Sequence, residues 1–161
     1  MLLDLLDNAV LSWALIACGI AQFSKLFFEL IQHQKWRPAV LLETGGMPSS
    51  HSAFVTGTAS GVGFQLGFED PLFAVAATIA FVVMYDASGI RRSSGLIAQR
   101  VNDLSSKIDN QITINKLKEN LGHERLEVFI GSLIGPAVAL PGIAYLGSPS
   151  HLAQIVFATF G

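Results

Sequence analysis

Two histidines of this chain stand where a helix is expected to begin, next to glycines and small polar residues. The first is His51, in the stretch GGMPSSHS from Gly45 to Ser52, just ahead of an apolar run that starts at Ala53. Helix starts bind anions because their first N–H groups lack partners and the dipole is positive there. A histidine at that place can also move a proton near neutral pH. The stretch is therefore typical of phosphate chemistry at the mouth of a membrane helix.

The second histidine, His123, stands just before another apolar segment, and Glu127 follows it at the i,i+4 spacing that puts both on one helix face. A carboxylate bonded to one ring nitrogen fixes the tautomer and raises the basicity of the other nitrogen. His123 is then a candidate nucleophile or base. The alternative is an interfacial histidine beside solvated charges, and the presence of His51 at a second helix start favours the functional interpretation.

Charged residues near these histidines are candidates for holding a phosphate. Lys25 and Glu29 lie one turn apart inside the first apolar segment, where a buried charge is costly and indicates function. The alternative is an ion pair, or a lysine that reaches the interface. Arg91 and Arg92 follow Asp86, which could orient one of them for bidentate phosphate binding, or they anchor the chain at the membrane. Lys35 and Arg37 carry the same ambiguity.

The composition indicates an integral membrane protein. Of 161 residues, 51% are apolar and only 14% are charged, and the mean hydropathy is +0.51. Soluble domains carry about 25% charged residues. The net charge of −2 gives no case for nucleic-acid binding. Cys18 is the only cysteine, which excludes a disulfide framework and a cysteine-based metal site.

Apolar segments of about 20 residues can cross a membrane. The chain has four such segments and a short fifth, which predicts one all-α bundle of four to five membrane helices: 9–31, 53–68, 71–88, 126–146 and the short 151–160. Pairs of glycines at GxxxG spacing in the second and fourth segments predict close helix contacts and allow a homodimer. Between the third and fourth segments, the polar segment 89–125 carries apolar residues at helical spacing from Ile97 to Ile108. This spacing predicts an amphipathic helix on the membrane surface. A short helix is expected after it, over 114–121.

Every Lys and Arg falls on one side of this topology, and the turn at Glu69 and Asp70 on the other side has none. The positive-inside rule then makes the basic side cytoplasmic. The Gly45–Ser52 stretch, both arginines and His123 would share that face.

These residues resemble a known family. The stretch GGMPSSHS, the block YDASGIRR from Tyr85 to Arg92 and the block LGHE from Leu121 to Glu124 are similar to the divergent branch of the type 2 phosphatidic acid phosphatases, a family related to the vanadium-dependent haloperoxidases. The resemblance runs from about Lys25 to Gly135. It implies a metal-independent reaction, with no cofactor, in which one histidine attacks phosphorus and a second protonates the leaving alkoxide.

Carried over to this chain, the resemblance makes His123 the nucleophile, Glu127 its orienting base and His51 the general acid. Ser50 replaces the family's glycine, and Glu127 its aspartate. Lys25 or Lys35 would take the place of the family's lysine, and Arg91 or Arg92 that of its arginine. The candidate phosphate ligands are then Lys25, Gly46, Ser49, Ser50, Arg91 and Arg92.

The leading hypothesis is a phosphatase that acts on a phosphomonoester lipid at the inner face, such as phosphatidic acid, phosphatidylglycerophosphate or an isoprenoid phosphate. The alternative is a non-catalytic membrane binding or assembly protein that retains the phosphate pocket.

Overall fold

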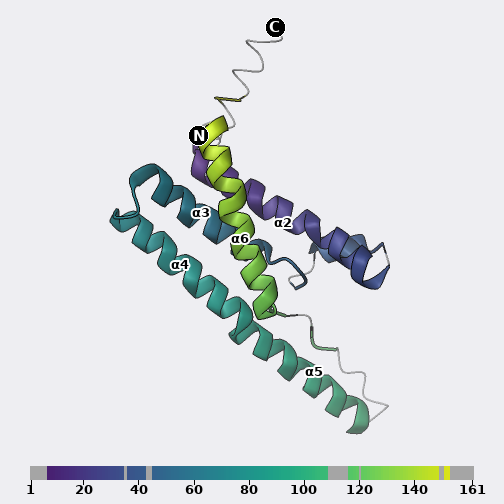
Figure 1. The fold of residues 1–161 in the computed structure, drawn as a ribbon. Coiled ribbons are helices and arrows are strands. Elements are labelled where there is room, and N and C mark those ends of the chain that lie inside the picture. The colour runs from purple at the N-terminus through teal and green to yellow at the C-terminus, as the bar shows by residue number, and fades with distance from the viewer. Residues whose placement is uncertain are drawn as a thin grey trace.

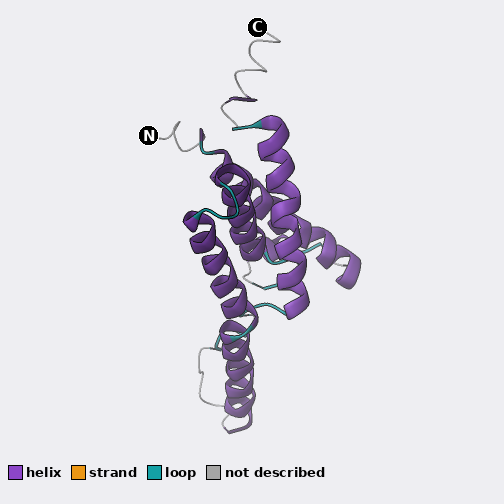
Figure 2. Ribbon diagram, turned by 60° about the vertical axis from the view of Figure 1, so that its left-hand side comes forward, coloured by secondary structure: helices purple, strands orange, loops and turns teal. Residues whose placement is uncertain are grey.

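The computed structural model describes residues 7–34, 36–42, 45–108, 116–119, 121–148 and 151–152. Every regular element in these ranges is helical (Figures 1 and 2). In chain order they are α2 (Ala9–His33), the 3-10 helix η1 (Pro38–Leu42), α3 (Ser50–Leu66), α4 (Pro71–Ser88), α5 (Ile90–Ile108), α6 (Arg125–Pro141) and the π-helical turn η2 (Gly142–Leu146). The all-α prediction is confirmed.

Three helical stretches are long and apolar enough to cross a membrane: Ala9–Ile31, Pro71–Lys107 and Arg125–Leu146. The remaining bundle helix, α3, has 17 residues and is rich in glycine. It is not among the helices that are long and apolar enough to cross a membrane. The expected short fifth helix, 151–160, lies outside the described residues except for 151 and 152. The prediction of a multi-pass membrane bundle therefore holds, with α3 as its least apolar member.

Small residues let α3 and α6 approach closely, as the glycine spacing predicted. A Cβ added at Gly135 would collide with Thr56 and with the backbone of Ala53 and Gly57. A Cβ at Gly57 would touch both Gly135 and the backbone of Ala14 in α2. Backbone contact at this distance is available only where side chains are absent. The three helices α2, α3 and α6 thus form one packed unit.

α2 and α6 pack together at one end only. Ala9 and Val10 of α2 form an apolar core with Ala139 and Ile143, and the Trp13 indole N–H donates to the Gly147 carbonyl over 2.7 Å. From there the two helices splay apart toward the start of α6 (Figure 1). We call the end that holds the starts of α3 and α6 the site end of the bundle.

The predicted amphipathic helix is present as α5. It continues close to the line of α4 beyond Gly89, as both ribbon views show (Figures 1 and 2). Ile97, Val101 and Leu104 remain exposed on it. Its expected flat orientation on the membrane stays a prediction, and it would require a bend at Gly89 if α4 stands upright in the bilayer.

The prediction of a short helix over 114–121 is wrong for the residues that the structure describes there, because 116–119 are not helical. Instead, residues 116–119 have no regular secondary structure and lie against α5. The Asn102 side-chain amide donates to the Leu117 carbonyl (2.9 Å), and its oxygen accepts from the Leu117 N–H (3.0 Å). A Cβ at Gly95 would collide with the Glu119 and Leu121 backbone. Side-chain bonds to the backbone therefore replace the helical ones, and the segment leads directly to His123.

Candidate active site

The stretch from Gly45 to Ser52 forms a loop and the first turn of α3. Gly46 has φ +89°, a left-handed conformation that favours glycine. Ser49 is the N-cap of α3: its hydroxyl accepts from the Ser52 N–H over 3.3 Å and from the Ser52 hydroxyl over 2.9 Å. Ser49 is fully buried and Ser50 nearly so. Both serines were predicted as phosphate ligands. In this structure the Ser49 side chain caps the helix, while Gly46 lines two open cavities.

The starts of α3 and α6 are tied together. The Ser49 N–H donates to the Glu127 carbonyl over 3.0 Å, and a Cβ at Gly131 would collide with the Ser49 carbonyl. The start of α3 therefore packs against the first two turns of α6, whose own first N–H groups are capped by the Glu124 and Glu127 side chains. The start of α3 is thus the helix end that favours an anion here.

His123 and Glu127 form the pair that the sequence predicted. His123 Nδ1 lies 2.9 Å from Glu127 Oε2, and the same carboxylate oxygen accepts from the Glu124 N–H over 3.1 Å. Only 3% of His123 is exposed. With the proton held on Nδ1 by the carboxylate, Nε2 keeps its lone pair. Among the described side chains, His123 Nε2 is the one buried nitrogen or oxygen without a hydrogen-bond partner.

The backbone also fixes His123, in a way the sequence analysis missed. The His123 N–H donates to the Ala87 carbonyl at the end of α4 over 2.9 Å. Gly122 has φ +79°, and a Cβ there would collide with the backbone of Arg91 and Arg92. The glycine directly before the histidine was the available signal. It allows the chain to turn against the start of α5 and to present the ring.

A cavity of about 100 Å³ brings both histidines together with one arginine. His51, His123 and Arg91 line it, along with Val83 and Ala87 of α4. Burial lowers the pKa of His51 below its usual 6.5, and the charges of His123, Arg91 and Lys25 lower it further. His51 is therefore poised to release a proton readily when the cavity holds no anion.

The two arginines, which the sequence left as alternatives, have different surroundings. Arg91 Nε bonds Asp86 Oδ2 over 2.6 Å, the orienting contact that the sequence suggested. Arg92 Nη2 bonds Glu124 Oε1 over 3.1 Å and faces a different cavity. Arg91 alone shares the small cavity with both histidines.

Lys25 reaches the site from the middle of α2. It is 2% exposed, and its Nζ donates to the Gly45 carbonyl over 3.1 Å. Glu29, its suggested ion-pair partner, lies with Oε1 3.7 Å from Arg37 Nε. Lys25 thus fixes the loop that precedes α3, and it lies beside Glu127 in a shared cavity. Lys35 lies outside the described residues.

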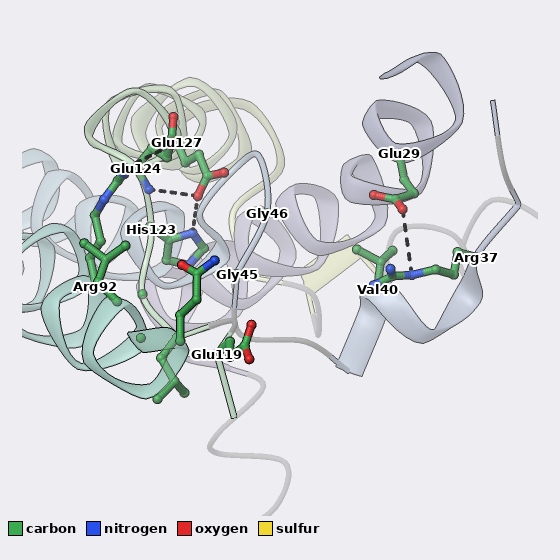
Figure 3. A pocket seen from close by; sticks show the side chains of 15 residues that line it. Glu29, Arg37, Val40, Gly45, Gly46, Arg92, Glu119, His123, Glu124 and Glu127 are labelled. Carbon is green, nitrogen blue, oxygen red and sulfur yellow. Dashed lines mark hydrogen bonds and ion pairs between the residues drawn. The ribbon is translucent and has the colours of Figure 1, made fainter. Parts of the chain in front are cut away.

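A wider cleft of about 430 Å³ opens on the other side of His123 (Figure 3). Figure 3 shows His123 beneath Glu124 and Glu127, with Arg92 on one side and the Glu29–Arg37 pair across the cleft. Four carboxylates and two arginines line it, so its charge is less favourable for an anion than that of the small cavity. Of the candidate phosphate ligands, Arg91 shares the small cavity with both histidines, while Lys25 lies beside Glu127 in another cavity.

Comparison with known proteins adds two matches. A family described as "Divergent PAP2 family" matches residues 6–138. An uncharacterized membrane protein of Bacillus subtilis, YuiD, is 39% identical over 153 residues, which cover 86% of this chain and 96% of the relative. No solved structure matches the chain.

Proposed function

This chain belongs to the divergent PAP2 family, and we propose that it is a membrane phosphatase that hydrolyses a phosphomonoester lipid through a phosphohistidine. One observation carries the proposal: the buried, unpartnered Nε2 of His123, whose Nδ1 is held by Glu127, at the convergent starts of α3 and α6. A buried lone pair without a donor is costly. A phosphorus atom placed in the adjacent cavity would give it a bonding partner.

In the proposed reaction, the Nε2 lone pair of His123 attacks phosphorus, and the bond from phosphorus to the lipid oxygen breaks. The imidazole becomes positively charged, and Glu127 stabilises that charge at Nδ1–H. Protonated His51 gives its proton to the departing alkoxide. A water that loses a proton to His51 then attacks the phosphohistidine, the P–N bond breaks, and phosphate leaves.

The cations and helix starts hold the phosphoryl oxygens in this proposal. Arg91 faces the cavity and is oriented by Asp86, so its remaining N–H groups are positioned to bind oxygen. The free N–H groups of the first turn of α3 and the buried charge of Lys25 add to the same field. Because the described Lys and Arg residues gather at the site end and on α5, we place this end on the cytoplasmic side.

The direct test is a panel of phosphomonoester lipids with the purified protein in detergent and no added metal. Phosphatidic acid, phosphatidylglycerophosphate and an isoprenoid phosphate cover the candidate headgroups. We expect phosphate release from at least one of them, with saturation kinetics. The absence of turnover with every lipid, from protein with an intact thermal transition, would contradict the proposal.

The depressed pKa of His51 predicts a limb of the pH profile along which activity falls with rising pH. Because kcat/KM reports the free enzyme and the general acid must be protonated, kcat/KM should fall as pH rises through the pKa of His51, below 6.5. The measurement is the pH profile of kcat/KM with one lipid. The His51→Gln variant should be slow at all pH values and should lack this limb. If kcat/KM of that variant fell over the same pH range, the titrating group would be a residue other than His51.

A matched pair of variants tests the choice between the arginines. Arg91→Gln should lower kcat/KM about 100-fold, because it removes a donor aimed at the charge that develops in the reaction. Arg92→Gln should have a much smaller effect. Each change leaves one partly exposed carboxylate without its arginine, so the two variants control for each other. A larger loss of kcat/KM for Arg92→Gln than for Arg91→Gln would indicate that the phosphate binds in the wider cleft.

The near-complete burial of His123 supports the alternative, a protein that holds a phosphate without turning it over. The two functions differ in a covalent intermediate. Rapid acid-free quenching with ³²P-labelled lipid, followed by digestion, should leave label on the peptide that contains His123. Saturable vanadate binding without any labelled peptide would support the binding protein.

A further inference from the structure

We infer that the substrate lipid reaches the site through an opening between α2 and α6 at the site end of the bundle. This inference rests on the proposed function and specifies the side from which the substrate arrives. A cavity of about 470 Å³ lies between these helices, and three carboxylates, one lysine and five uncharged residues line it: Glu29, Glu124, Glu127, Lys25, Phe28, Val40, Gly46, Met47 and Leu126.

The helix geometry explains why a cavity is found there. α2 and α6 are joined at the opposite end by their apolar core and by the bond from Trp13 to Gly147. They splay toward the site end (Figure 1). Both are long and apolar enough to cross a membrane, so a gap between them faces lipid along its length. In our inference, the widening opens to the bilayer at the depth of the site.

The polarity of the lining changes in the direction that an amphiphile requires. Phe28 and Leu126 lie at the surface, 37% and 59% exposed. The cavity also holds the buried ammonium of Lys25 and the carboxylates of Glu29, Glu124 and Glu127. Apolar side chains at the mouth fit acyl chains, and Lys25 is the cation in this lining that can meet a phosphate. We assign the opening to a phosphorylated lipid on this ground.

The cavity shares no lining residue with the small cavity of His51 and Arg91, but the wider cleft shares residues with both. Gly46, Glu124 and Glu127 line both this cavity and the cleft that contains His123 (Figure 3). A headgroup that enters beside Lys25 therefore meets the carboxylate that holds the nucleophile. The cavity beside α4 is smaller, about 100 Å³, and has room for the phosphoryl group rather than for the chains.

The test is to block the mouth. In a Cys18→Ser background, which removes the only native cysteine, Phe28→Cys and Leu126→Cys are labelled with a bulky maleimide. Labelled Phe81→Cys, on the exposed surface of α4, is the matched control. We expect a loss of roughly tenfold or more in kcat/KM for dioleoyl phosphatidic acid at both mouth positions and none at the control. Hydrolysis of the water-soluble para-nitrophenyl phosphate should change little.

The paired substrates separate failure of the route from failure of the function. Unchanged turnover of the long-chain lipid by both labelled mouth variants would overturn the route, and so would an equal loss with both substrates. If the parent protein hydrolyses neither substrate, the proposed function fails. The route is then tested by binding alone, using phosphatidic acid with a photoreactive acyl chain. Crosslinks at the site ends of α2 and α6 would support the route, and crosslinks confined to α4 would overturn it.

Discussion

Replacement of His123 by alanine is expected to lower kcat by roughly a thousandfold or more, because it removes the atom that bonds phosphorus. The ring is held by three separate contacts: Nδ1 on Glu127, the backbone N–H on the Ala87 carbonyl, and the turn at Gly122. These contacts fix the ring, and none of them uses Nε2. That nitrogen is therefore available for the reaction. The measurement is phosphate release from the best lipid of the panel.

The control for this variant is His151→Ala. His151 is exposed and lies after α6 and η2, far along the chain from the site end, so this change should leave kcat unaltered. Glu127→Gln is the informative intermediate: it retains the size of the side chain but loses the charge that supports the imidazolium. It should fall between the parent and His123→Ala. Equal activity of His123→Ala and the parent would refute the phosphohistidine mechanism.

The helices were predictable because their signals are local. Apolar runs of the length that a bilayer requires, bounded by Asn8, by Asp70 with Pro71 and by Gly89, mark α2 and α4 within a few residues. The His123–Glu127 pair was predictable for a similar reason. Two residues at i,i+4 spacing at a helix start lie on the same face of the helix, within reach of each other. Residue type and spacing alone determine these features.

The parts that sequence could not give depend on distant contacts. The sequence did not show that Ser49 is a buried cap of α3, a role set by its hydrogen bonds with Ser52 and the approach of Gly131; its binding of phosphate stays a prediction. The segment before His123 was expected to be helical, but Asn102 offers its backbone a better partner on α5. Likewise, the cavity between α2 and α6 follows from how two helices splay. None of these contacts has a signature in the local pattern.

Gly131→Ala is expected to have the largest effect on stability, about 1–3 kcal/mol, because the new methyl group would overlap the Ser49 carbonyl. The backbones of α3 and α6 must separate to accept it. That separation lengthens the bond from the Ser49 N–H to the Glu127 carbonyl and moves His51 away from His123. We therefore expect a lower melting temperature in detergent and, in the protein that remains folded, lower activity.

Gly19→Ala is the matched control, because a Cβ at Gly19 in α2 would meet nothing within 4 Å. In that open position alanine should raise helix stability by up to about 1 kcal/mol, since it favours the helix over glycine. The same substitution in two helices of one bundle thus has opposite expected signs. A melting temperature for Gly131→Ala equal to that of the parent would mean that α3 and α6 do not meet at Ser49. The convergence of two helix starts, on which the phosphate site depends, would then be lost as well.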